Sequence, residues 1–115
     1  MEVTMQYGTR EFYRVKVERT DRPSYDPTGD LVQFAFLPRG SAWSEDLWGA
    51  GTWDTVDGIH YALGLVGTTP PDDYAGDLFD LPAGSYSVFT RIIDDPENPK
   101  DLVGTLRLKE APSGR

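Results

Sequence analysis

Four oxygen-bearing side chains lie close together in the segment DDPENP (94–99), those of Asp94, Asp95, Glu97 and Asn98. Carboxylate and amide oxygens of this kind are ligands that Ca²⁺ prefers. An EF-hand loop, however, needs donors at alternating positions, a central glycine and a closing glutamate, and two prolines interrupt any such series here. We therefore interpret the segment as a hairpin tip and a contact surface, and we predict no bound metal and no cofactor.

The sequence offers little for catalysis. His60 is the sole histidine, and it lies inside the apolar run 59–66, where a hydrogen-bonded structural role is commoner than a catalytic one. The chain has no cysteine, so no thiolate nucleophile is available. Acidic residues are so numerous that pairs such as Glu45 and Asp46 arise by chance and do not indicate glycosidase chemistry. We predict that the protein is not an enzyme.

Three tryptophans, Trp43, Trp48 and Trp53, are spaced five residues apart. An odd spacing cannot place all three on one face of a single strand, so at least one is expected in a loop or bend. One interpretation places Trp53 in the core with the other two covering its open end. The alternatives are a protein interface anchored by Trp43 and Trp48, or a platform on which sugar rings stack.

The charge is negative and unevenly distributed. The formal net charge is -8, and residues 23–85 contain a single basic residue, Arg39, among many acidic ones. Binding to nucleic acid is disfavoured because it requires a face rich in Lys and Arg. No apolar run approaches the length of a membrane span. We expect a soluble protein, without cysteine pairing, made in a reducing compartment.

Short apolar runs with a period of two predict an all-β protein. The expected strands lie within 13–19, 31–37, 51–55, 59–66, 76–81, 85–93 and 102–108, separated by segments rich in Pro, Gly and Asp. About seven strands in this length predict one immunoglobulin-like antiparallel β-sandwich. Gly84 and Tyr86 lie at the start of a strong strand. This arrangement predicts either a tyrosine corner, in which the Tyr86 hydroxyl bonds back to the preceding connection, or a Tyr86 ring that only fills the core.

The expected domain covers residues 11–109, followed by a flexible tail at 110–115. Residues 1–10 also alternate, with Val3, Met5 and Tyr7 on one side. They are predicted either to form an extra edge strand or to be an arm that adds a strand to a neighbour's sheet.

Four segments together carry a resemblance to a known family: Tyr13-x-Val15-x-Val17, DPTGDLVQFAFLP (26–38), WGAGTWDT (48–55) and residues 81–108. The chain resembles small proteins encoded among the virion structural genes of tailed phages that infect actinobacteria. It is more loosely similar to the N-terminal immunoglobulin-like domain of phage upper baseplate proteins. In those domains a Pro-Gly-x-Tyr turn leads into the penultimate strand, and the corresponding turn at 82–86 is one residue longer here.

The resemblance implies a non-enzymatic virion structural protein. We expect several copies to pack against head, head–tail connector or tail proteins, with the head or connector favoured over the baseplate. Interface candidates are Val3, Met5, Tyr7, Trp43, Trp48 and the acidic residues of DDPENP. A carbohydrate-binding module that uses residues 43–53 is the alternative from a different class, and a capsid decoration or baseplate-associated adhesion domain is another. The expected location is the virion, after synthesis in the host cytoplasm.

Overall fold

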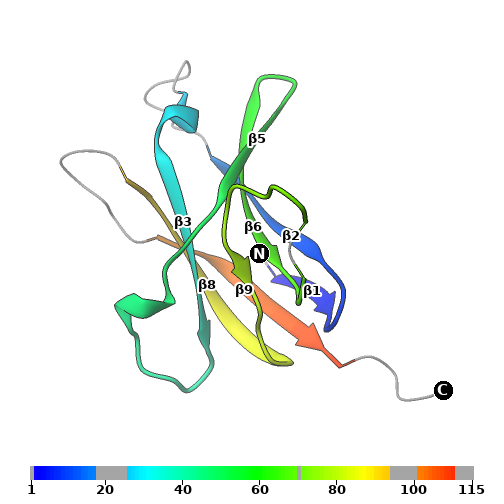
Figure 1. The fold of residues 1–115 in the computed structure, drawn as a ribbon. Coiled ribbons are helices and arrows are strands. Elements are labelled where there is room, and N and C mark those ends of the chain that lie inside the picture. The colour runs from blue at the N-terminus through cyan, green and yellow to red at the C-terminus, as the bar shows by residue number, and fades with distance from the viewer. Residues whose placement is uncertain (1, 18–25, 70, 94–100, 111–115) are drawn as a thin grey trace.

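The computed structural model describes residues 2–17, 26–69, 71–93 and 101–110, and nine strands and two short 3-10 turns lie within these ranges (Figure 1). The proposed interface residues Asp94, Asp95 and Glu97 fall outside the described residues, as does all of the expected tail except Glu110. The elements, in chain order, are β1 (Glu2–Gln6), β2 (Glu11–Val17), η1 (Pro27–Gly29), β3 (Leu31–Pro38), η2 (Glu45–Leu47), β4 (Gly49–Ala50), β5 (Thr52–Val56), β6 (Ile59–Val66), β7 (Leu78–Phe79), β8 (Gly84–Ile93) and β9 (Asp101–Lys109).

The strands form two sheets that pack as a sandwich, which confirms the predicted all-β, immunoglobulin-like class. The first sheet has the order β1-β9-β8-β3-β4 and the second has the order β2-β6-β5, with β7 also paired to β6. Figure 1 shows β8 in yellow beside β9 in orange, as their antiparallel register requires. Two pairs depart from the predicted antiparallel arrangement, because β1 runs parallel to β9 and β7 runs parallel to β6.

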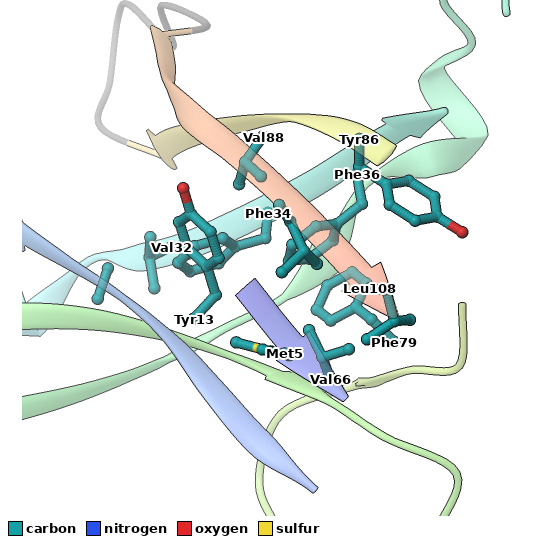
Figure 2. Close-up of a cluster of buried hydrophobic side chains, with 12 residues drawn as sticks. Met5, Tyr13, Val32, Phe34, Phe36, Val66, Phe79, Tyr86, Val88 and Leu108 are labelled. Atoms are coloured by element: carbon teal, nitrogen blue, oxygen red, sulfur yellow. The ribbon is translucent and has the colours of Figure 1, made fainter. Parts of the chain in front are cut away.

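The core is built from the alternating residues of both sheets. Tyr13 of β2 and Phe34 of β3 are fully buried, and their rings meet edge to face with centroids 6.4 Å apart. Phe36, two residues further along β3, stacks on Phe34 and meets Tyr13 at 5.9 Å. These interlocking rings occupy the space between the sheets in Figure 2. The Tyr13 hydroxyl crosses that space and donates a hydrogen bond of 3.3 Å to the carbonyl of Thr105 in β9.

Gly51 lies where the chain passes from β4 in the first sheet to β5 in the second. A Cβ atom at this position would lie 2.8 Å from the carbonyl oxygen of Leu63 and 2.9 Å from the ring of Phe34. The missing side chain therefore allows the crossing segment to approach the core closely. This contact explains why the tryptophan-rich segment carries a glycine here.

Tyr86 lies near the start of β8, just after the chain has crossed from β7 in the second sheet to β8 in the first. Its ring is buried, and its hydroxyl donates a hydrogen bond to the backbone carbonyl of Pro82. Gly84, two residues earlier, has a φ of +154°, which glycine adopts without the strain that a side chain would cause. The bond is the one that defines the predicted tyrosine corner.

The N-terminal segment lies in its own domain's sheet. Of the two predicted alternatives, the structure has the edge strand, with Val3 packed against the core and Met5 inside it. Figure 2 shows Met5 near Val66 and Leu108. Tyr7 follows the strand in a turn and is 41% exposed, so it does not share the burial of Met5. A deletion of residues 1–9 would therefore remove a core side chain, which means that this segment is not simply a detachable arm.

Candidate protein-binding surface

Trp43 and Trp48 lie together on the outer face of the five-stranded sheet. Between them, Ser44 caps the short turn η2 by accepting a hydrogen bond from the backbone N–H of Asp46 at 3.2 Å. The turn reverses the chain, so that the two indole rings meet edge to face with centroids 5.4 Å apart. Trp53 lies elsewhere, in β5, where its indole N–H donates to the carbonyl of Asp30 at 2.9 Å and its ring packs against the core.

The sheet supplies the floor beneath these rings. Core residues such as Val88 and Thr90 alternate along β8 with Phe89 and Arg91, which therefore face outward. The Phe89 ring meets that of Trp43 at 5.2 Å, and the guanidinium of Arg91 lies over Trp48 at 4.3 Å from the ring centre. We call Trp43, Trp48, Phe89 and Arg91 the outer-face cluster.

Polar neighbours hold the Arg91 guanidinium, the cation of the outer-face cluster, in place. Arg91 Nε donates to Gln33 Oε1 at 2.6 Å, and Gln33 is its partner across the β3–β8 ladder. An Arg91 terminal nitrogen also lies 3.5 Å from Glu45, whose other carboxylate oxygen accepts a 2.6 Å bond from the indole N–H of Trp43. Glu45 thus links the tryptophan to the arginine, so that the rings and the charge are held in one arrangement before any partner arrives.

Two leucines beside the outer-face cluster are widely exposed. Leu31 is 70% exposed and Leu102 is 64% exposed. Leu31 pairs with Ile93, whereas Leu102 pairs with Phe89, so both lie on the same outer face, near the end of the sheet where β8 stops and β9 begins. The residues that join β8 to β9, with the three predicted acidic contact residues, lie outside the described part of the chain.

The indole N–H of Trp48 is buried and has no hydrogen-bond partner among the described residues. A buried donor without an acceptor costs free energy compared with one exposed to water. The position of the Trp48 ring therefore depends on its contacts with Trp43 and Arg91 rather than on its own polar group.

The sequence predicted Trp43 and Trp48 as contact residues but did not predict the residues around them. Phe89 and Arg91 could have been found, because they alternate along the strand with the inward residues Val88 and Thr90. Leu31 begins β3 and Leu102 is the second residue of β9, and their exposure depends on which neighbours cover the sheet ends. The other predicted contact residues in the described part lie apart from this surface, Val3 and Met5 on β1 and Tyr7 in the turn that follows it.

His60 lies on the other sheet, away from the outer-face cluster. Its Nδ1 is 2.9 Å from the Thr55 hydroxyl, and its Nε2 is 3.8 Å from Asp26. Hydrogen bonds from the hydroxyl and the backbone N–H of Thr28 lower the pKa of Asp26, with a smaller contribution from His60. These contacts hold a loop onto a strand end, and the hydroxyl beside the imidazole belongs to Thr55, the register partner of His60 on β5.

Within the described ranges, no group of three or more His, Cys, Asp or Glu side chains could hold a metal ion. The same residues include no helix long and apolar enough to cross a membrane. Comparison with protein-family models, with curated proteins and with solved structures finds no match for this chain.

Proposed function

We propose that this chain is a non-enzymatic structural protein of a tailed-phage virion that packs in several copies against head, connector or tail proteins. The observation that carries the binding role is the outer-face cluster with its two exposed leucines. The virion setting comes from the sequence resemblance. The two fit together, because a particle subunit needs a rigid surface for its neighbours more than it needs a reactive site.

The chemistry of the surface favours a protein as the partner. Tryptophan and arginine are the residues that contribute most binding energy at protein interfaces, particularly when they are held rigidly and surrounded by apolar contacts. The rings of Trp43 and Trp48 already hold each other in place through their edge-to-face contact. Leu31 and Leu102 add exposed apolar surface beside them. The matching partner would present an apolar patch with a carboxylate or carbonyl near Arg91, which is only partly covered.

The experiment removes the apolar flank without touching the fold. We expect the double variant Leu31→Ser, Leu102→Ser to lose saturable co-sedimentation with particles that lack this protein, because both side chains are mostly exposed and contribute little to folding. Val56→Ser is the matched control, since Val56 is 44% exposed on the β5–β6 hairpin of the other sheet. Unchanged binding by the double variant, or equal loss in the control, would contradict the proposal.

A carbohydrate-binding role is supported less well. Stacking on a sugar requires an aromatic ring face open to water. The face of Trp48 is covered by Arg91, and Trp43 contacts both Trp48 and Phe89. Quenching of tryptophan fluorescence by acrylamide, together with a glycan array, tests this alternative. Strong quenching with saturable binding of a sugar would favour it over the virion role.

A further inference from the structure

β1 ends the five-stranded sheet, as β2 and β5 end the other sheet among the described residues. Edge strands usually avoid pairing with other chains by carrying Lys, Pro or a bulge. β1 reads EVTMQ and has none of these features. Among the described residues β1 pairs only with β9, which leaves its other side without a strand.

The backbone groups on that free side can be identified. The Tyr7 N–H donates to the carbonyl of Lys109 in β9, at 2.6 Å. Because successive residues of a strand direct their backbone groups to opposite sides, the odd-numbered residues of β1 face β9 and the even-numbered ones face away. The carbonyl of Gln6 agrees with this alternation, since it accepts bonds from Thr9 in the turn rather than from β9. The N–H and C=O of Thr4 therefore point out from the edge.

We propose that two copies of this chain pair through β1, antiparallel and with Thr4 on the twofold axis. In this register Thr4 faces Thr4 of the second copy, and the two residues exchange both N–H to C=O bonds. Glu2 faces Gln6, and the N–H of Gln6 meets the open carbonyl of Glu2. Val3 faces Met5, so the apolar side of one strand continues onto the apolar side of the other. The two five-stranded sheets become one continuous sheet.

The side chains explain why the partner is a second copy. The symmetric register places a Thr–Thr pair at the axis and no like charges directly opposite each other, and cross-strand pairs of this kind stabilise a sheet. The same symmetric pairing about the middle residue of β2 would oppose two copies of Arg14, and about the middle of β5 it would oppose two copies of Asp54. Like charges directly opposite each other destabilise strand pairing. Of these three edges, only β1 is complementary to itself.

The outer side of the junction also has compatible charges. Thr4 is the register partner of Arg107, and Gln6 is the partner of Lys109, so both basic side chains lie one strand in from the edge. Across the axis, Glu2 of one copy faces Gln6 of the other and stands two strand spacings, roughly 10 Å, from its Lys109. Long side chains of opposite sign can approach across this distance. Arg107 and Lys109 of one copy remain separated from those of the other copy by both β1 strands.

The test uses position 4 in the full chain. We expect wild-type protein to show a concentration-dependent dimer by sedimentation equilibrium. Thr4→Pro removes the N–H that points away from β9 and spares the β1–β9 bonds. It should raise the dissociation constant of the dimer roughly thirtyfold, as the loss of both bonds at the axis implies. Thr4→Val is the control, because it keeps the backbone donor and should keep the dimer. The melting temperature, extrapolated to low protein concentration, should be similar in the two variants.

A charge pair locates the axis. Thr4→Lys and Thr4→Glu should each be monomeric alone, because each would oppose two like charges, whereas an equimolar mixture should form a heterodimer. A wild-type monomer at roughly millimolar concentration, the upper range for weak association, would overturn the proposal. So would a dimer that survives Thr4→Pro, which would indicate exchange of β1 between subunits or a different contact.

This pairing deepens the proposed function, and its place in an assembly rests on that function. The dimer itself is measured on the purified protein without particles. Failure of the β1 dimer therefore differs from failure of the outer-face cluster to bind a particle, because each variant set alters only one of the two surfaces.

Discussion

The outer faces of the two sheets use the same pair of groups in different ways. On the five-stranded sheet, Arg91 lies over Trp48 and is 24% exposed. On the four-stranded sheet, Arg14 lies over Tyr61 at 4.8 Å, forms a 3.2 Å ion pair with Asp54 and is 47% exposed. The difference lies in the covering segment, because residues 43–48 fold over the first face whereas the second faces water. An arginine over an aromatic ring thus becomes part of a rigid surface only where a loop encloses it.

The largest effect is expected where the chain crosses from one sheet to the other. Gly51→Ala should lower the free energy of unfolding by about 2 to 3 kcal/mol, because the added methyl would meet the Leu63 carbonyl and the Phe34 ring. Urea unfolding measures this change. Gly29→Ala is the control, since a Cβ there meets no atom within 4 Å. Equal effects of the two substitutions would show that the crossing is not tightly packed.

The two arginines give the direct comparison of the faces. Arg91→Ala should cost about 2 kcal/mol, because it removes the bond to Gln33 and the cover of Trp48 together. Arg14→Ala should cost less than about 1 kcal/mol, since exposed ion pairs contribute little. Thermal unfolding of both variants checks the ranking, and the tryptophan emission should shift only for Arg91→Ala. A larger cost at Arg14 would contradict the role given to the covering loop.

Two tyrosine hydroxyls connect parts of the sandwich, and they should differ in strength. Tyr86→Phe should cost about 1 kcal/mol, the usual net value of one hydrogen bond in a protein. Tyr13→Phe should cost less, because its bond to Thr105 is long at 3.3 Å. The midpoint of urea unfolding should rank the two variants in this order. An unchanged midpoint for Tyr86→Phe would remove the corner as a stabilising feature.

The same two hydroxyls predict an effect of pH that is absent at neutrality. Burial raises the pKa of Tyr13 to about 12 and also raises that of Tyr86. Since the pKa of Tyr13 is higher in the folded than in the unfolded chain, its contribution to stability is complete below about pH 10 and is lost as the pH rises towards 12. The melting temperature should fall across this window. The tyrosinate absorbance that marks ionisation of these buried tyrosines should rise over the same pH range. Tyr13→Phe should remove part of that fall.

Sequence alone predicted the sandwich because its inward positions are strongly patterned. The runs around Tyr13, Phe34 and Tyr86 each alternate clearly, and the structure places these residues in the core. The pairing of β1 was not predictable, because alternation marks a strand without naming its neighbour. The outer-face cluster was predicted only at its tryptophans. Its floor depends on register, which brings Arg91 of β8 beside Gln33 of β3, 58 residues away in the chain.

The parallel pairing of β1 with β9 also has a mechanical consequence. Glu2 begins β1 opposite Thr105, and Gln6 ends it opposite Lys109, so the two strands run in the same direction. A force that pulls the N-terminal end of β1 and the C-terminal end of β9 in opposite directions would slide the two strands along each other. Their hydrogen bonds would then bear the load together instead of opening one after another, as in the peeling of a hairpin. This geometry would resist extension at the edge of the sheet.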